Sequence, residues 1–233
     1  MNASRTARER VRAELMGEIA EIARRQLAED GAAGLSLRAV AREMGMASSA
    51  IYRYYASRDD LLTALIIDGY NAVGEAVERA EAARDRADLM GRWLAVCHAV
   101  RDWALARPHE YALLYGSPVP GYSAPEDTIA PAMRDAAVFG RIVSDAHRAG
   151  VLDPPGGYPP PPASFAADAV VIREAVLPEV PDDVVARAVT AWPGLFGTVG
   201  FELFGQFDNV ITDRAATFDY AMRGLGRFVG LPG

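Results

Sequence analysis

Apolar residues recur at the spacing of an α-helix along most of the chain, and this pattern constrains the fold more than any other feature. Ile19, Ile22, Ala23 and Leu27 lie three or four residues apart and form one stripe along a helix. No segment alternates between apolar and polar residues as a half-buried strand requires. The sequence therefore predicts an all-α fold.

The expected helices fall into two groups. The first group covers about residues 8–30, 37–44, 47–54 and 57–83, and the second covers about 86–106, 108–115, 126–149, 164–176, 182–207 and 213–229. Two segments, 116–125 and 153–162, are expected to be loops. The second contains six prolines, which excludes a helix, and we expect it to be mobile or poorly ordered.

The charge is distributed unevenly along the chain. The net charge of −7 is unfavourable for a nucleic-acid-binding protein, but residues 1–60 hold ten arginines and nine acidic residues. Within them, Arg5, Arg8, Arg10 and Arg12 are accompanied only by Glu9 and form a basic arm. A local basic surface matters more for phosphate binding than the overall charge. The first 60 residues thus remain candidates for DNA contact.

Composition narrows the cellular setting. The single cysteine, Cys97, excludes a disulfide within the chain and a cysteine-based metal site, and it fits a reducing cytoplasm. The N-terminus has no apolar core of signal-peptide length. No run approaches 18 uncharged apolar residues, so no membrane-spanning segment is expected.

The segment MGMASSAIYRYYASRDDLL (44–62) contains an unusual set of serines, tyrosines and arginines behind a glycine. Two short helices joined at Gly45 have the form of a helix-turn-helix. Ile51 and Tyr55 lie four residues apart and are expected to face inward, which would expose polar side chains on the opposite face. Serine and arginine can contact base edges or phosphates, and tyrosine hydroxyls can contact phosphates. The predicted DNA contacts are Arg38, Ser48, Ser49, Tyr52, Arg53, Tyr54 and Arg58.

On spacing alone, this motif favours DNA binding and purely structural packing equally. The basic arm and the cluster of tyrosines shift the interpretation towards DNA binding. The segment LSLRAVAREMGMASSAIYRYYASRDDLLTALI (35–67) also closely resembles the DNA-binding domain of the tetracycline-repressor family of bacterial transcription regulators. The similarity covers roughly residues 8–68. It includes the serine cap, the small residue Ala41, Gly45, the run Ile51–Tyr55 and a Leu–Leu pair.

This resemblance implies an N-terminal three-helix helix-turn-helix domain at residues 1–60 and a C-terminal ligand-binding and dimerisation domain at residues 61–233. It implies a homodimer that binds a palindromic operator, usually as a repressor, and is released by an unidentified small-molecule effector. The segment AWPGLFGTVGFELFGQF (191–207) more weakly resembles a subgroup with a Trp-x-x-x-His-Gly motif. Here Phe196 stands in the place of the histidine, so that histidine's role cannot be transferred.

The C-terminal part is expected both to pair with a second chain and to bind the effector. The predicted dimer interface follows two stripes near the C-terminus and consists of Leu195, Phe196, Val199, Leu203, Phe207, Phe218 and Met222. An ordinary core face is the alternative. The predicted effector pocket consists of Trp93, Cys97, Val100, Arg101, Trp103, Tyr111, Tyr115 and Phe139, although aromatic stripes of this kind more often belong to a core. Few obvious buried charges favour a small apolar or aromatic effector.

Other classes of function have less support. The three histidines are scattered, and the chain has no recognisable nucleophile, phosphate-binding or metalloprotease motif, so we expect neither an enzyme nor a metal or cofactor site. A helical adaptor with weak, non-specific DNA binding remains the alternative. The sequence does not identify the effector, the operator, the regulated genes, the direction of regulation or the number of dimers on each operator.

Overall fold

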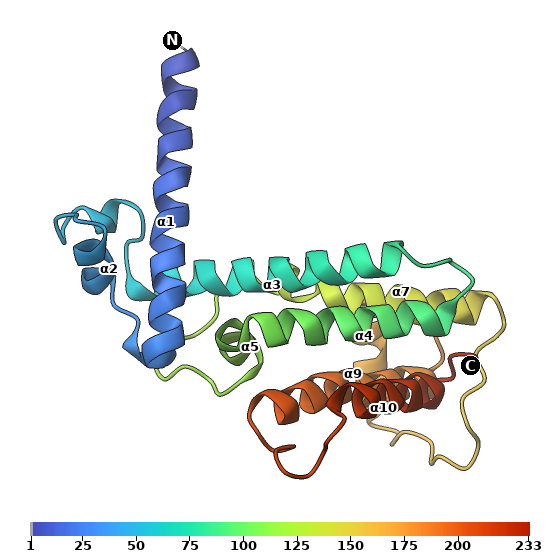
Figure 1. Ribbon diagram of the computed structural model, residues 1–233. Helices are drawn as coiled ribbons and strands as arrows, with labels where there is room; N and C mark the ends of the chain where they lie inside the picture. The colour runs from blue at the N-terminus through green and yellow to red at the C-terminus, as the bar shows by residue number, and fades with distance from the viewer. Residues whose placement is uncertain (1) are drawn as a thin grey trace. The chain divides into compact units, whose positions relative to one another are not determined.

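The computed structural model describes the backbone of residues 2–233 and the side chains from Arg8 onward. All regular structure within these residues is helical, which confirms the predicted all-α fold (Figure 1). The helices are α1 (Asn2–Gly34), α2 (Leu37–Glu43), α3 (Arg58–Ala82), α4 (Leu89–Ala106), α5 (Pro108–Tyr115), α6 (Ile129–Ala132), α7 (Arg134–Arg148), α8 (Phe165–Ala175), α9 (Asp182–Leu203) and α10 (Arg214–Val229), with short 3₁₀ helices η1 (Ile51–Arg53) and η2 (Glu126–Thr128).

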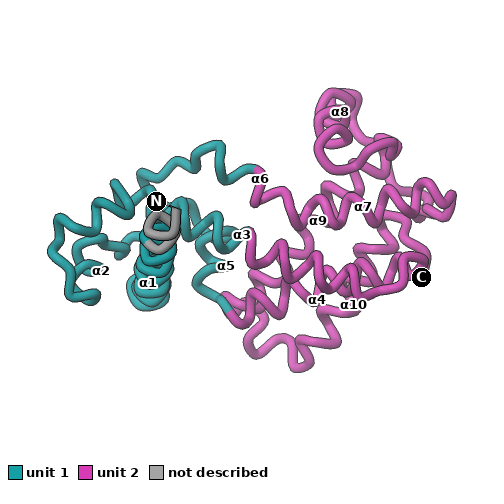
Figure 2. Tube along the Cα trace, turned by 90° about the horizontal axis from the view of Figure 1, so that it is seen from above, with its two compact units in different colours: residues 1–70, 107–129 teal, residues 71–106, 130–233 magenta. Residues whose placement is uncertain are grey.

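The chain forms two compact units (Figure 2). Unit 1 comprises residues 1–70 and 107–129, and unit 2 comprises residues 71–106 and 130–233. Helix α3 therefore contributes its first half to unit 1 and its second half to unit 2. The units follow spatial compactness, whereas the division predicted at residue 60 concerns function and stays a prediction.

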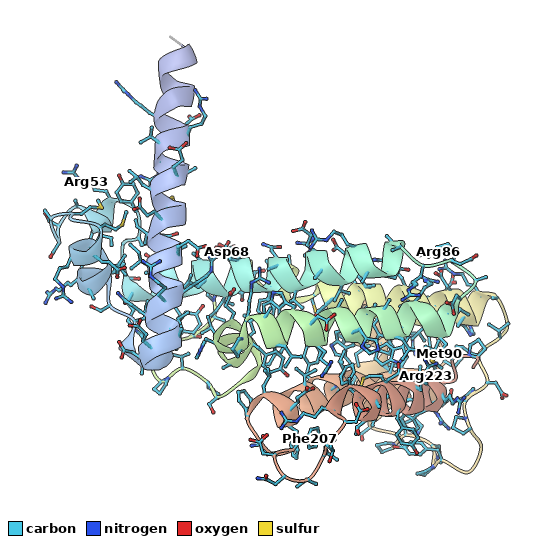
Figure 3. All side chains as sticks on the ribbon, viewed as in Figure 1. Arg53, Asp68, Arg86, Met90, Phe207 and Arg223 are labelled. Carbon is cyan, nitrogen blue, oxygen red and sulfur yellow. The ribbon has the colours of Figure 1, made fainter. Side chains whose placement is uncertain are left out.

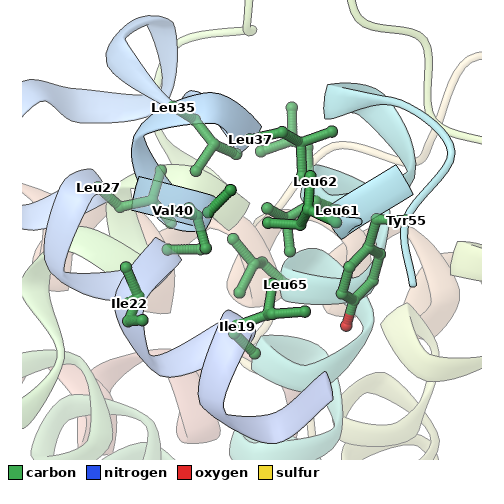
Figure 4. Packing of buried hydrophobic residues seen from close by; sticks show 14 of the residues in the cluster. Ile19, Ile22, Leu27, Leu35, Leu37, Val40, Tyr55, Leu61, Leu62 and Leu65 are labelled. Carbon is green, nitrogen blue, oxygen red and sulfur yellow. The ribbon is translucent and has the colours of Figure 1, made fainter. Parts of the chain in front are cut away.

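The core of unit 1 joins α1, α2, η1 and the start of α3 (Figure 4). Ile19, Leu27, Val40, Ile51 and Leu61 are among its fully or almost fully buried members. Burial of such side chains is the main favourable contribution to folding, at about 1.5–3 kcal/mol for each large aliphatic residue. The predicted stripe of the first helix is therefore the inner face of this unit.

Residues 107–129 pack onto the same core, although they are distant from it in sequence. Leu113, Leu114 and Val119 lie against the buried cluster, and the hydroxyl groups of Thr63 and Tyr122 are hydrogen-bonded at 2.9 Å. Helix α5 also contacts α1. The expected loop 116–125 is thus a docked part of unit 1.

The core of unit 2 is formed mainly by α4, α7, α9 and α10. Trp93 of α4 is fully buried, and its indole nitrogen donates to the carbonyl oxygen of Met222 in α10 at 2.7 Å. Gly226 permits this close approach, because a Cβ atom there would lie 2.7 Å from the Trp93 ring. The buried cation Arg92 is balanced by Glu81 and Asp145, which connects the end of α3 with α4 and α7.

Two expected helices are shorter in the structure. The segment predicted as one helix at 126–149 is divided into η2, α6 and α7. Pro131 within α6 has no N–H group to donate, and the chain turns at Met133 before α7 begins. The helix expected to reach residue 207 ends at Leu203, and Gly205 adopts a left-handed conformation with φ of 80°.

The proline-rich segment 153–162 is non-helical, as predicted, and is attached to unit 2. Asp153 N donates to Gly230 O at 2.9 Å, and Arg187 donates to Pro155 O at 3.0 Å. The Tyr158 ring packs edge-on against Phe228 with centroids 4.8 Å apart. These contacts hold the segment against the C-terminal helices.

One helix in the described part of the chain, α9, is long and apolar enough to cross a membrane by length and composition alone. No such segment was expected from the sequence. Helix α9 carries the buried charged residues Arg187 and Glu202 and packs against α8 and α10. The core helix of a folded domain meets the same criterion, and these contacts identify α9 as a core helix of unit 2.

Candidate nucleic-acid interface

The first helix of the predicted motif is α2, and its start is well defined. Ser36 lies in an extended conformation before the helix, and its hydroxyl accepts a hydrogen bond from Ala39 N at 3.4 Å. This is the arrangement expected of a serine N-cap. The backbone N–H of Ser36 in turn donates to the side chain of Gln26 in α1 at 3.1 Å. Gln26 therefore links α1 to the start of α2 and helps to fix the orientation of α2.

The turn after α2 depends on Gly45. Its φ of 66° lies in the left-handed region, which glycine adopts at little cost. The following residue, Met46, donates from its N–H to Ala41 O at 2.8 Å and closes the turn. The chain can therefore reverse direction immediately after α2, as the sequence pattern predicted.

The second helix of the motif differs from the prediction of an α-helix at 47–54. Residues 48–50 form turns, and only Ile51–Arg53 are helical, as η1. The hydrogen bonds are mainly of the i to i+3 type, such as Ala50 N to Ala47 O at 2.8 Å and Tyr54 N to Ile51 O at 2.9 Å. Adjacent serines, whose side chains compete for backbone hydrogen bonds, disfavour a regular α-helix here.

The two faces of this segment are nevertheless separated as predicted. Ile51 is fully buried and Tyr55 is 7% exposed, and both belong to the core of unit 1. Ser48, Ser49 and Arg53 are exposed on the other side, and Tyr52 is 45% exposed. Figure 3 labels Arg53 at the outer edge of this segment. The segment thus presents hydroxyl groups and one guanidinium to its surroundings.

Two further predicted contacts lie on α2 and directly after η1. Arg38 is exposed in the first turn of α2. Tyr54 is half-buried, and the guanidinium carbon of Arg12 lies 5.4 Å from the centre of its ring. A groove of about 340 Å³ is lined by Tyr54 together with Arg8, Val11, Arg12 and Leu15 of α1. The basic arm is therefore helical and adjoins η1; the side chain of Arg5 lies outside the described residues.

Arg58 does not match its predicted role. Its Nε atom donates to Leu35 O at 3.2 Å and its Nη2 atom to Ala32 O at 2.6 Å, while Nη1 contacts Asp59. Carbonyl oxygens at the end of a helix attract cations, so the end of α1 provides a strong site for this side chain. Arg58 is therefore a structural link within unit 1, and we remove it from the candidate DNA contacts.

The residues predicted to line an effector pocket are divided between the two units. Trp93, Cys97, Val100, Trp103 and Phe139 are buried in unit 2. Tyr111 and Tyr115 belong to unit 1, where their ring centres lie 5.1 Å apart. Burial raises the pKa of the Cys97 thiol well above its ordinary value, which makes it an unreactive core residue.

An aromatic row in unit 2 includes two residues outside the predicted pocket. Phe139 lies 4.8 Å from Trp93 and stacks on Trp192 at 5.2 Å, and Trp192 meets Phe196 edge-on at 5.1 Å, all between ring centres. The row connects α4, α7 and α9. Trp192 lies four residues before Phe196, so the two side chains share one face of a helix. This spacing is the sequence signal that could have predicted their contact.

The predicted pocket residue Arg101 is already paired. Its Nε and Nη2 atoms donate to the two carboxylate oxygens of Glu202 at 2.7 and 2.6 Å, and its guanidinium lies 5.4 Å from the centre of the Phe218 ring. Two parallel hydrogen bonds of this kind fix orientation as well as charge. Arg101 therefore joins α4 to α9 and α10, and its charge is already paired with Glu202 of the same chain.

Most of the predicted dimer interface is core. Leu195, Val199, Phe218 and Met222 are at most 1% exposed within a single chain, so a second chain could not reach them. Their stripes are the faces along which α9 and α10 pack together and onto α4. Helical spacing alone cannot distinguish an internal face from an interface, because both are apolar. Phe196, Leu203 and Phe207 remain half-buried.

Comparison with protein families gives two matches. The family described as "Bacterial regulatory proteins, tetR family" matches residues 19–65. The family described as "Tetracyclin repressor-like, C-terminal domain" matches residues 93–225, more than half of the chain. The first match contains α2, the Gly45 turn and η1, and the second contains the core helices of unit 2.

Individual relatives agree with these matches. The chain is 40% identical over 221 residues to the HTH-type transcriptional regulators Rv1816 of Mycobacterium tuberculosis (strain ATCC 25618 / H37Rv) and Mb1846 of Mycobacterium bovis, covering 94% of this chain and 92% of each relative. Among solved structures, it resembles the proposed regulatory protein SCO4313 with a TM-score of 0.76 and 34% identity, over 93% of this chain and 97% of the other. A protein of unknown function from Rhodococcus sp. RHA1 has a TM-score of 0.66 and 26% identity, over 90% and 94% of the two chains.

Proposed function

This chain belongs to the tetracycline-repressor family of bacterial transcription regulators, a family of DNA-binding helix-turn-helix proteins and not of enzymes, and from this we propose its specific mode of action. The protein binds a palindromic operator in the cytoplasm as a homodimer. It represses transcription until a small apolar or aromatic effector releases it.

The observation that carries this proposal is the exposed face of residues 48–53. Ser48, Ser49, Tyr52 and Arg53 are exposed together, above a buried pair that fixes the segment on the core. Small side chains allow close approach to DNA, and arginine can donate to guanine or phosphate. Because few of these residues are long, shape-dependent recognition by Arg53 and the basic arm supplies part of the specificity.

Dimerisation is assigned to an exposed face of α9, α10 and the turn between them. Phe201, Phe204, Val210 and Tyr220 are between 50% and 80% exposed in the single chain. Clusters of exposed apolar residues typically mark interaction sites. A two-fold axis through this face would make the interface self-complementary, as the family resemblance implies. This face replaces the four predicted residues that are buried in the core, Leu195, Val199, Phe218 and Met222.

Effector binding is assigned to unit 2. The aromatic row of Trp93, Phe139, Trp192 and Phe196 supports an apolar or aromatic effector, because such molecules favour aromatic surroundings with few polar groups. The finer resemblance to the Trp-x-x-x-His-Gly subgroup is part of this proposal. At the position of that subgroup's histidine, Phe196 supplies a ring and no titratable group.

A gel-shift experiment tests the proposal. The probe is the DNA immediately upstream of the gene for this protein, at two salt concentrations and with random-sequence competitor. The expected result is a competitor-resistant shift at dimer stoichiometry, which requires about tenfold or more protein in Arg53→Ala. Weak binding that is abolished by both salt and competitor would favour the helical adaptor, because non-specific binding is dominated by salt-sensitive phosphate contacts.

A further inference from the structure

A single buried polar side-chain atom in the described part of the chain has no hydrogen-bond partner: the indole nitrogen of Trp103 on α4. The Trp103 residue is only 4% exposed, so solvent does not cover this atom. Buried donors in folded proteins are nearly always paired, because an unpaired donor loses its bonds to water without replacement. The Trp103 N–H group therefore requires an explanation.

Trp93 provides a comparison on the same helix. It is also buried, but its N–H donates to Met222 O at 2.7 Å. The packing around α4 can thus satisfy one indole donor within the chain, while it leaves the other unsatisfied. A phenylalanine at position 103 would give an apolar ring without this cost. The indole at 103 is explained if its acceptor comes from outside the chain.

The turn that carries Trp103 is rigidly held. Two residues earlier, Arg101 is bound by both oxygens of Glu202 in α9 and lies over the Phe218 ring in α10. The Trp103 donor is therefore presented from a fixed helix and not from a loop. A fixed donor favours a ligand whose acceptor occupies one defined position.

The charges of α4 limit what kind of acceptor can bind. The two arginines that α4 buries or half-buries are already paired, Arg92 with Glu81 and Asp145, and Arg101 with Glu202. A carboxylate or phosphate on a ligand beside Trp103 would lose its hydration without gaining a free cation from this helix. A neutral oxygen acceptor loses much less hydration free energy on burial than a charged group does. A single hydrogen bond from one indole N–H group can replace that hydration.

We propose that Trp103 donates a hydrogen bond to the effector, and that the effector is an uncharged, apolar or aromatic molecule carrying a carbonyl or ether oxygen. This inference rests on the proposed effector binding in unit 2 and specifies its chemistry. It assigns to Trp103 the selection of molecules with an acceptor over pure hydrocarbons of the same shape.

The test uses two probes of nearly equal shape, acetophenone and ethylbenzene, which differ by the carbonyl group. Indole signals in a ¹⁵N–¹H spectrum of the full-length protein report Trp93, Trp103 and Trp192, and the Trp103 signal is assigned by its absence in Trp103→Phe. Without a probe, the Trp103 proton is expected upfield of the hydrogen-bonded Trp93 proton. Acetophenone should shift it downfield, whereas ethylbenzene should not.

Affinity gives a second measurement. The wild-type protein should bind acetophenone at least fivefold more tightly than ethylbenzene, and Trp103→Phe should lose this preference while its operator binding stays within twofold of wild type. Ser144→Ala is the control: it removes a buried hydroxyl group of α7 that donates to Pro178 O, and it should retain the preference for acetophenone. If the Trp103→Phe protein does not fold, the two-probe comparison in the wild-type protein decides.

Two results would overturn the proposal. One is a Trp103 proton that already has the shift of a hydrogen-bonded indole without any probe. The other is equal affinity for the two probes, including no binding of either. Operator binding is measured separately on the same samples, so a failure of the regulator proposal would appear as the absence of specific DNA binding, whatever the indole signal does.

Discussion

Arg58 donates from its Nη2 atom to the carbonyl oxygen of Ala32 at 2.6 Å, and so connects the first turn of α3 to the end of α1. Its Nε atom reaches Leu35 O in the same region. Arg53, five residues earlier, is exposed on the candidate DNA-binding face. Two arginines only five residues apart thus have different surroundings, and they should respond differently to mutation.

We expect Arg58→Ala to lower the free energy of unfolding by about 1–3 kcal/mol, because its charged hydrogen bonds to two carbonyl groups are removed. Arg53→Ala should leave stability unchanged and weaken operator binding about tenfold or more, since a good base contact contributes about 1–3 kcal/mol. Urea unfolding and gel shifts on both variants measure this difference. Arg79→Ala, an exposed arginine of α3 in unit 2, is the control and should change neither property appreciably.

If Arg53→Ala binds the operator as tightly as the wild type, the face at residues 48–53 does not contact DNA. If Arg58→Ala is as stable as the wild type and fails to bind DNA, Arg58 returns to the set of DNA contacts. Each variant therefore tests a separate assignment.

The basic arm should control the salt dependence of DNA binding. Replacing both Arg8 and Arg12 with alanine should reduce the slope of log K against log salt by about 0.9 for each phosphate that the arm no longer neutralises. Operator titrations at four or more salt concentrations give the slope. The double variant Arg79→Ala/Arg148→Ala removes the same charge from unit 2 and should leave the slope unchanged; equal slopes for all three proteins would exclude phosphate binding by the arm.

The exposed face of α9 and α10 should mediate pairing. Tyr220 is 80% exposed, so Tyr220→Arg should not destabilise the single chain, but it would place a charge within an apolar interface. We expect a monomer in sedimentation velocity and weaker operator binding. Val171→Arg alters an exposed apolar residue of α8 and should remain dimeric. A dimeric Tyr220→Arg beside a monomeric Val171→Arg would move the interface to α8.

Asp145 should make the stability of unit 2 sensitive to acid. Burial alone would raise its pKa, but the hydrogen bond and charge of Arg92, supported by Arg86 and Arg148, hold the pKa of Asp145 below its ordinary value of 3.8. A carboxyl group whose pKa is lower in the folded state stabilises the fold above its unfolded pKa, and this contribution disappears as the pH falls through the folded value.

We therefore expect the free energy of unfolding of Asp145→Asn to be about 3 kcal/mol lower than that of the wild type at pH 7. This value is at the lower end of the cost of breaking a buried ion pair, because Glu81 still balances the charge of Arg92. The difference should begin to shrink near pH 4, where Asp145 in the unfolded chain becomes protonated, and should shrink further as the pH falls towards the lower folded pKa. Thermal or urea unfolding from pH 7 to pH 3 measures both effects. A difference that stays constant over this range would show that removal of the charge is not the cause.

The sequence alone determined the helical fold, the α2–Gly45 turn and the two faces of residues 48–55. These features depend on neighbouring residues: a serine cap, a glycine at positive φ, and the spacing of Ile51 and Tyr55. Local geometry determines each of them, so a single sequence contains the necessary information. The regular α-helix expected at 47–54 does not form, because adjacent serines favour tighter turns.

Only the tertiary structure decided which apolar and charged residues face one another. Leu195 and Met222 have the helical spacing of an interface but are core residues, and Arg58 has the spacing of a DNA contact but binds carbonyl groups of α1. The unpaired state of the Trp103 indole likewise depends on the absence of an acceptor on helices distant in sequence. Such facts arise from contacts between residues tens to more than a hundred positions apart, and the periodicity of a single helix carries no information about its partners.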